Sequence, residues 1–310
     1  MKILVTGATG LIGKPLCRAL VRAGHDLRAF ARNVPRATPH LPAGTDLRRV
    51  PRDPAEWVAL VEGCDAIINL VGEGIVKGHW SDRRKEELRA SRVDTTAHLV
   101  AACAATARRP KVLVNASAIG FYGPRGDDPV DETSEPGDDF LAGMCSEWEA
   151  AAAVGEACGM RVVRARIGVV LSTEGGGLAR MLPLFRVGLG GPLGNGQQFF
   201  SWIHEDDVTG LLLHALQSPE VSGAINLTAP EPLRNRVFAQ VLGRVLARPS
   251  FFSPPDFCVR LAFGEVADAI LLTGQKVLPK VAGQTGYTFR FPDAESALRD
   301  LLDRPAPPEA

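Results

Sequence analysis

A glycine-rich segment near the amino terminus, residues 6–13 (TGATGLIG), has a spacing that could bind a phosphate. In this pattern Gly7 would permit a tight turn, Gly10 would let the backbone approach a pyrophosphate, and Gly13 would let a helix pack on a strand. An apolar run precedes the segment and a helical pattern follows it, and the start of such a helix offers free N–H groups to an anion. The segment therefore predicts a dinucleotide site; the alternative is a glycine-rich turn without a ligand. The expected contacts are Gly7, Thr9, Gly10, Leu11, Ile12 and Gly13.

The residues after the second apolar run, 27–31, indicate which dinucleotide would bind. An acidic residue here would hold the ribose 2′-hydroxyl of NAD, whereas an arginine would accommodate the 2′-phosphate of NADP. Residues 27–36 contain no Asp or Glu, and Ala31 is followed by Arg32 and then by Arg36. We therefore predict NADP(H), with Arg32 as the main contact and Ala31 and Arg36 beside it. The alternative is that Arg32 is a solvated surface charge.

Strands and helices alternate along the first half of the chain. The predicted strands are 3–5, 27–31, 46–50, 65–71, 111–116 and 161–171, and the predicted helices are 11–23, 81–107 and 141–157. Because most of the strands are continuous apolar runs, they are typical of a parallel sheet that is covered on both faces. We therefore predict an α/β fold, with a Rossmann-like, doubly wound parallel sheet and a smaller carboxyl-terminal α+β lobe.

The alternation ends after residue 172, where glycine-rich loops begin. We predict a nucleotide-binding domain over 1–172, with contributions from about 200–230, and a substrate lobe with interleaved segments over 173–253. A small carboxyl-terminal domain would cover 254–304, and a tail 305–310. Within these parts we expect helices at 205–217 and 234–247, a strand at 224–227 and a short strand near 287–291.

The carboxyl ends of the strands are where a dinucleotide lies in this type of fold. The end of strand 65–71 should lie beside the adenine ribose and pyrophosphate, and the end of strand 161–171 beside the nicotinamide. The expected contacts at these ends are Leu70, Val71, Gly72, Glu73, Ser117, Val169 and Val170.

The helix 81–107 begins with a highly charged segment, RRKEELRASR at 83–92. We expect Arg92 to face the cofactor or a ligand phosphate, with Glu87 partly on the same side of the helix. The alternative for both residues is a surface ion pair, because charge runs are usually solvated faces.

The composition excludes several classes of partner. The chain has 310 residues with 35 basic and 35 acidic side chains and no basic run, which argues against nucleic acid or an anionic membrane. No apolar stretch approaches the ~18–20 residues of a spanning helix. The six cysteines show no C-x-x-C spacing, so no metal site is predicted. We expect a cytoplasmic protein with a small-molecule substrate, and a homodimer is the candidate assembly.

Several long motifs resemble the extended short-chain dehydrogenase/reductases, which include nucleotide-sugar epimerase-like proteins. These motifs are TGATGLIG at 6–13, KVLVNASAIGFYG at 111–123 and FFSWIHEDDV at 199–208. A narrower similarity is to an atypical subgroup called "epimerase family protein", which has a small carboxyl-terminal domain of undefined function. It rests on NLVGEGI at 69–75, SRVDTT at 91–96, Trp148-Glu149, RIGVVLSTEGGG at 166–177, GLGGPLGNGQQFFSWIH at 188–204 and GQKVLPK at 274–280. The resemblance covers nearly the whole chain and implies the fold and the cofactor, but no reaction.

The chain departs from that class at the catalytic pair. Catalytic members use a Tyr and, four residues later on the same helix, a Lys that lowers the pKa of the Tyr. This chain has two tyrosines, Tyr122 and Tyr287, and neither is followed by Lys at that spacing. The resemblance puts Leu141 and Cys145 at the two positions, and Cys145 reads more simply as a small buried residue.

Three residues remain as weak catalytic candidates: Ser117, Tyr122 and His204. Ser117 would hydrogen-bond a substrate carbonyl or, alternatively, satisfy the backbone at a buried strand end. Tyr122 lacks a lysine partner, so its pKa should stay high. His204 precedes an acidic helix start, where a structural role is favoured over that of a proton shuttle. The other residues expected to line a substrate pocket are Lys77, Trp80, Gln197, Gln198 and Trp202, together with Tyr122.

Two functions from different classes follow. The first is an NADP(H)-dependent oxidoreductase or epimerase-like enzyme that acts on an unidentified small polar substrate. The second is a non-catalytic NADPH-binding sensor or regulator. Absence of the Tyr–Lys pair favours the second, and a polar and aromatic pocket over the nicotinamide would favour the first.

Overall fold

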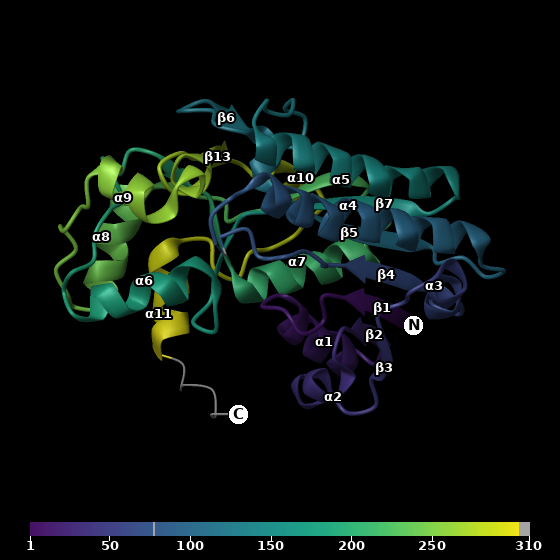
Figure 1. The fold of residues 1–310 in the computed structure, drawn as a ribbon. Helices are drawn as coiled ribbons and strands as arrows, with labels where there is room; N and C mark the ends of the chain where they lie inside the picture. Colours follow the sequence, from purple (N-terminus) through teal and green to yellow (C-terminus); the bar gives the residue numbers. More distant parts are fainter. Residues whose placement is uncertain (77, 304–310) are drawn as a thin grey trace.

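The computed structural model describes residues 1–76 and 78–303, so Lys77 and the predicted tail lie outside the described residues. Its central element is a sheet of seven strands in the order β11-β7-β5-β4-β1-β2-β3 (Figure 1). All neighbouring strands in it run parallel, which confirms the predicted sheet. The strands are β1 (Lys2–Thr6), β2 (Asp26–Ala31), β3 (Asp46–Arg49), β4 (Ala66–Asn69), β5 (Val112–Ala118), β7 (Arg161–Ile167) and β11 (Gly223–Leu227).

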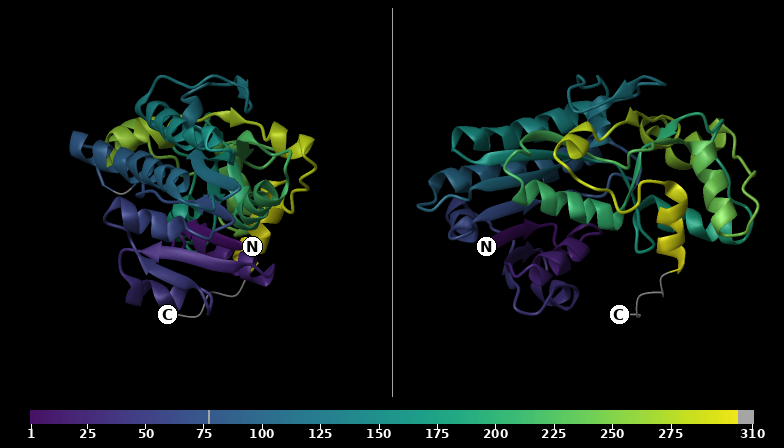
Figure 2. Two further views of the ribbon diagram at one scale, coloured as in Figure 1. Left: turned by 90° about the vertical axis from the view of Figure 1, so that its right-hand side faces the viewer. Right: turned by 180° about the vertical axis from the view of Figure 1, so that it is seen from behind.

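Helices cover both faces of this sheet (Figures 1 and 2). Ile3 and Val5 of β1 pack with side chains of α1 and α7 on one face, while Leu4 packs with side chains of α3, α4 and α5 on the other. Successive side chains of a strand point to opposite faces, so a strand covered on both sides must be apolar throughout. The covering helices are α1 (Gly13–Arg22), α3 (Pro54–Val61), α4 (Asp82–Ala105), α5 (Phe140–Ala157) and α7 (Glu205–Gln217).

The strand order reverses beside β1, which pairs with β2 on one side and with β4 on the other. In doubly wound sheets the carboxyl ends of the strands at such a point border a crevice where ligands bind. The glycine-rich segment follows β1 directly and therefore lies at this point. The second lobe lies at the same end of the sheet (Figure 1).

The second lobe has its own apolar core. Leu182 of α6, Phe238 of α8 and Leu298 of α11 are buried together with Trp202. Its main elements are β8 (Val169–Leu171), α6 (Gly176–Arg186), β9 (Phe199–Phe200), β10 (Trp202–His204), β12 (Leu233–Arg234), α8 (Asn235–Val245), α9 (Asp256–Phe263) and α11 (Ala294–Asp303). The remaining short elements are α2 (Val34–Ala37), η1 (Thr38–His40), η2 (Ile119–Tyr122), β6 (Pro129–Val130), η3 (Ala267–Leu271), β13 (Lys276–Val277) and α10 (Lys280–Gln284).

The predicted strand 161–171 is two strands. Its first part, β7, belongs to the central sheet, but β8 leaves that sheet and pairs with β10. The break falls at Gly168, where a Cβ atom would lie 2.5 Å from the carbonyl oxygen of Ser201. The close approach of two backbones therefore separates β8 from the sheet, which periodicity alone did not indicate.

Two further segments differ from the predicted secondary structure. The segment 287–291 forms no strand, because the carboxylate of Asp207 in α7 accepts the backbone N–H groups of Arg290 and Phe291. Helix α3 was not predicted, although it has a clear start, with Asp53 accepting from the N–H of Glu56.

Two kinds of feature are missing from residues 1–76 and 78–303. No helix there combines the length and apolar character needed to cross a membrane. No group of three or more His, Cys, Asp or Glu side chains there could hold a metal ion.

Candidate functional site

The glycine-rich segment forms a closely packed loop between β1 and α1. Gly7 has a φ of +64°, and a Cβ atom there would lie 2.6 Å from the carbonyl oxygen of Leu70. A Cβ atom on Gly13 would overlap the carbonyl oxygen of Gly7. The first position of α1 is preceded by Ile12, which provides no side-chain cap, and the first turn has no acidic residue. The start of α1 is thus suited to an anion, since no carboxylate competes for its N–H groups.

The other predicted cofactor contacts come from separate segments that meet around this loop. Leu11 lies close to the turn after β8, since a Cβ atom built on Gly175 would lie 3.3 Å from its Cδ1 atom. A Cβ atom on Gly176 in the same turn would lie 3.4 Å from the carbonyl oxygen of Val170. The predicted contacts that are exposed or partly exposed are Gly7, Thr9, Gly10, Leu11, Ile12, Ala31, Arg32, Arg36, Leu70, Val71, Gly72, Glu73, Glu87, Val169 and Val170.

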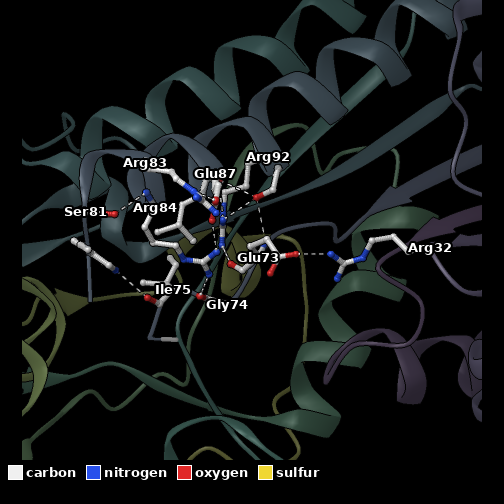
Figure 3. A network of polar contacts seen from close by, with 12 residues as sticks. Arg32, Glu73, Gly74, Ile75, Ser81, Arg83, Arg84, Glu87 and Arg92 are labelled. Atoms are coloured by element: carbon white, nitrogen blue, oxygen red, sulfur yellow. Dashed lines mark hydrogen bonds and ion pairs between the residues drawn. The ribbon is translucent and has the colours of Figure 1, made fainter. Parts of the chain in front are cut away.

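The loop after β4 is held by side chains from α4 and the segment before it (Figure 3). Around Glu73, the Ser91 hydroxyl accepts from the backbone N–H at 3.1 Å, and Arg92 donates to the backbone carbonyl at 2.8 Å. Arg84 donates to the carbonyl of Gly74 at 2.9 Å. The indole of Trp80, expected to contact substrate, donates to the carbonyl of Ile75 at 3.0 Å. These bonds fix the path of the loop.

Arg92 and Glu87 differ in their surroundings although both lie on α4. Arg92 is buried, its guanidinium lies 5.4 Å from the ring of Trp148, and burial lowers its pKa. A Cβ atom on Gly72 would lie 3.1 Å from this guanidinium. Glu87 is exposed and pairs with Arg83 and Arg84, whose hydrogen bonds lower its pKa. Arg92 therefore lies beside the loop after β4, whereas Glu87 occupies the surface ion pairs of the alternative interpretation.

Arg32 and Glu73 form an ion pair across the carboxyl ends of β2 and β4. The Nη1 atom of Arg32 lies 2.8 Å from Oε1 of Glu73, and the Arg32 side chain is 85% exposed (Figure 3). Glu73 is an expected cofactor contact, but its pairing with Arg32 was not predicted, because the two residues are distant in the chain. The signal that could have found the pair is the usual strand order of doubly wound sheets, in which β1 lies between β2 and β4 and their carboxyl ends meet.

Two of the three catalytic candidates belong to a buried polar network. Ser117 donates to Oε1 of Glu149 at 2.7 Å, and Arg166 donates to both oxygens of Glu149 at 2.8 and 2.9 Å. Arg166 also donates to the Tyr122 hydroxyl at 3.0 Å, which in turn donates to Asn226 at 2.7 Å. The network joins α5, β5, β7 and β11.

This network occupies the hydroxyl groups that were expected to act on a substrate. Tyr122 is fully buried, and burial raises its pKa to about 12. Sequence analysis noted Glu149 and Arg166 only as parts of motifs. The signal that could have found them is the presence of charged residues within otherwise apolar segments, because buried charges are nearly always paired.

The positions that the resemblance assigns to Tyr and Lys carry buried apolar groups. Leu141 and Cys145 lie on the side of α5 that faces η2. If Gly120 in η2 had a Cβ atom, it would lie 3.3 Å from the Cβ atom of Leu141 and 4.0 Å from the Sγ atom of Cys145. Burial raises the pKa of the Cys145 thiol to about 12. Neither side chain can exchange a proton near neutral pH, which fits the absence of the usual pair.

His204 links the start of α7 to α11. Its Nδ1 atom accepts from the N–H of Asp206 at 3.0 Å, and its Nε2 atom lies 3.3 Å from Oδ2 of Asp300. The ring is fully buried against Phe291. This geometry matches the structural role that the acidic helix start favoured.

Two expected substrate residues of the second lobe have structural contacts. Trp202 is fully buried and donates to the carbonyl of Glu231, so its expected substrate contact is corrected to a role in the lobe's core. Gln198 donates to the carbonyls of Leu193 and Leu271. The neighbouring Gln197 is exposed.

Glu132 lies at the edge of the polar network, and we expect it to make the stability of the fold depend on pH. Its Oε1 atom accepts from the backbone N–H groups of Asn226 and Val281, and burial raises its pKa. A carboxyl whose pKa is higher in the folded than in the unfolded state stabilises the fold below its ordinary pKa, and this contribution is lost as pH rises through the raised value. We expect Glu132→Gln to gain stability relative to the parent protein as pH rises above the ordinary pKa of a carboxyl, in urea unfolding at a series of pH values. Parallel stability curves would contradict this.

Comparison with known proteins identifies the family of this chain. Residues 3–227 match the NAD dependent epimerase/dehydratase family, and residues 254–301 match a domain of unknown function, DUF1731. The chain belongs to the NAD-dependent epimerase/dehydratase family. Within it, the Arabidopsis thaliana epimerase family protein SDR39U1 homolog, chloroplastic, is 41% identical over 97% of this chain and 87% of its own length.

Two solved structures of relatives are similar over most of this chain. Human epimerase family protein SDR39U1 (isoform 2), solved with NADPH, superposes with a TM-score of 0.86 at 36% identity, covering 98% of this chain and 99% of its own. A nucleoside-diphosphate sugar epimerase from Corynebacterium glutamicum has a TM-score of 0.75 at 33% identity, covering 97% of this chain and 58% of its own.

Proposed function

We propose that this protein binds NADP(H) and is an oxidoreductase or epimerase-like enzyme for a small polar substrate, working without a Tyr–Lys pair. The observation that best supports this proposal is the exposed guanidinium of Arg32 at the end of β2. The glycine loop follows the neighbouring strand β1, and the helix that it begins has no side-chain cap. The solved human relative with NADPH supports the same cofactor. When bound, a nicotinamide cofactor supplies hydride chemistry.

The residues at this site fit such a cofactor. The N–H groups at the start of α1 would bind the pyrophosphate, and the closeness of Gly7 to Leu70 keeps the loop in place for this. Arg32 would pair with the 2′-phosphate, with Arg36 exposed nearby on α2. Arg92 and Ser91 would keep the loop after β4 in position for the adenosine.

A non-catalytic NADPH-binding regulator is the second candidate function. The observation that favours it is the burial of Ser117 and Tyr122 in one network with Glu149 and Arg166. In this arrangement both hydroxyls stabilise the fold and neither is presented to a substrate.

Cofactor preference tests the role of Arg32. We expect Arg32→Ala to weaken NADPH binding about 10- to 100-fold and to change NADH binding little, because a charge-assisted hydrogen bond contributes about 1.5–3 kcal/mol. Titration of the cofactor's fluorescence would measure both affinities. Arg108→Ala is the matched control, since Arg108 is a 72% exposed partner of Asp65, which immediately precedes β4, at the opposite end of the sheet. An NADPH to NADH ratio that Arg32→Ala leaves unchanged would refute the assignment.

Turnover separates the two candidate functions. The protein would be mixed with NADPH and a panel of carbonyl compounds and nucleoside-diphosphate sugars, and the absorbance of the reduced nicotinamide followed. Oxidation of NADPH with one class of compound supports the enzyme. An epimerase leaves the cofactor unchanged overall, so the sugars would also be incubated with NADP⁺ and checked for a change of configuration. NADPH binding with neither NADPH oxidation nor an epimerised product across the panel supports the regulator.

The remaining proposals concern organisation. We propose that 1–172 with parts of 200–230 binds the cofactor, that 173–253 forms the substrate lobe, and that 254–304 is a small carboxyl-terminal domain. We also propose a homodimer, which light scattering would test, and a cytoplasmic location.

A further inference from the structure

The Arg32–Glu73 pair puts a negative charge beside the residue that we assign to the 2′-phosphate. Glu73 Oε1 lies 2.8 Å from Arg32 Nη1, and the Glu73 side chain is 32% exposed. The two residues are 41 positions apart and follow strands that flank β1. At this position an acidic residue usually indicates NAD and an arginine usually indicates NADP, yet the folded chain places one of each here.

The backbone of Glu73 is fixed on both sides, so its carboxylate has limited freedom to move away. Its N–H donates to Ser91 and its carbonyl accepts from the buried Arg92. The next carbonyl, on Gly74, accepts from Arg84 (Figure 3). These three side chains belong to one helix, α4. The carboxylate therefore stays close to the end of β2 even when Arg32 turns toward another anion.

We propose that Glu73 is a specificity-determining residue that limits the preference for NADP(H) over NAD(H). This inference rests on the proposed function. A 2′-phosphate would have to replace the Glu73 carboxylate as partner of Arg32 and would then lie close to that carboxylate. Both effects oppose NADPH, whereas the 2′-hydroxyl of NADH carries no charge and meets neither. Glu73 thus reduces a selectivity that Arg32 alone would make larger.

Neutralising the carboxylate tests the proposal. We expect Glu73→Gln to bind NADPH about three- to tenfold more tightly and to bind NADH within about twofold of the parent protein. The gain should shrink at high salt, because exposed charges are screened. In an Arg32→Ala background the same change should give a smaller gain in NADPH affinity than in the parent protein, since the competition for the guanidinium is gone and only the repulsion between carboxylate and phosphate remains. Affinities would be measured by calorimetry, without any substrate.

Control variants test whether the effect on affinity comes from the charge of Glu73. Glu295→Gln removes another carboxylate that pairs with arginines, on α11, and should leave both affinities unchanged. Glu73→Ala should act in the same direction as Glu73→Gln, which separates charge from hydrogen bonding. Equal changes for NADPH and NADH, or weaker binding of NADPH, would overturn the proposal.

The experiment also distinguishes this inference from the proposed function. If Arg32→Ala leaves the NADPH to NADH ratio unchanged, the proposed cofactor site is wrong. If Arg32→Ala lowers that ratio and Glu73→Gln does not raise it, the site stands and only the role of Glu73 is wrong.

Discussion

Replacing Glu149 with alanine should lower the free energy of unfolding by about 3–5 kcal/mol, because it leaves a buried arginine without its counter-charge. The side chains of Glu149 and Arg166 are only 4% and 6% exposed, and two hydrogen bonds join them. The guanidinium also lies 3.5 Å from the ring centre of Phe121, so water cannot easily reach it. Ser117 would lose its acceptor as well. Chemical denaturation would measure the loss.

A neighbouring glutamate on the same helix provides the control. Glu147 is 56% exposed and lies 3.7 Å from Arg89, so Glu147→Ala should change stability by no more than about 0.5 kcal/mol. Replacing Glu149 and Arg166 together by methionine should recover part of the loss, because no charge is then left buried. Equal effects of Glu149→Ala and Glu147→Ala would show that the network is not buried as described.

Gly13→Ala should abolish most cofactor binding, with NADPH affinity falling at least about 100-fold. A Cβ atom here would overlap the carbonyl oxygen of Gly7 and lie 2.7 Å from Ala8 backbone atoms. The loop would have to move away from the start of α1, and two or more hydrogen bonds to a pyrophosphate would be lost. Overpacking of this kind also costs about 1–3 kcal/mol of stability. Fluorescence titration and urea unfolding would give the two quantities.

Gly143→Ala is the matched control for Gly13→Ala. Gly143 lies inside α5, and a Cβ atom there would have no neighbour within 4 Å. Alanine should therefore stabilise the helix by about 0.5–1 kcal/mol and leave NADPH affinity unchanged. If Gly13→Ala bound NADPH as well as Gly143→Ala does, the glycine loop would not be the pyrophosphate site.

The sheet was predictable because its signals are local. Several of the buried parallel strands contain a continuous apolar run, as in Ile3-Leu4-Val5, and β1, β4 and β5 are each followed by a helix that the same rules identify. The bend at Gly168 was not predictable, because it depends on a backbone approach from Ser201. The segment 287–291 was mispredicted because Asp207, far away in the chain, binds its N–H groups.

Some features of the candidate site were likewise predictable from the sequence, and others were not. The glycine loop and Arg32 were found from residue type and spacing at one strand end each. The pairing of Arg32 with Glu73 and the network around Glu149 join residues that are distant in the chain. Pattern analysis detects a residue that acts alone, but it does not reveal which partner neutralises a charge in the folded state.

The position of β11 at the edge of the central sheet affects how the chain can be divided and made. β11 pairs with β7 along five residues, from Gly223 to Leu227. A fragment that stops at 172 would end with β7 as an open edge strand, with unpaired N–H and carbonyl groups that invite aggregation. During synthesis the sheet likewise stays incomplete until residue 227 has emerged, after β8, α6, β9 and β10 of the second lobe. The cofactor-binding half is therefore completed by the half that follows it, so the two are made as one folding unit.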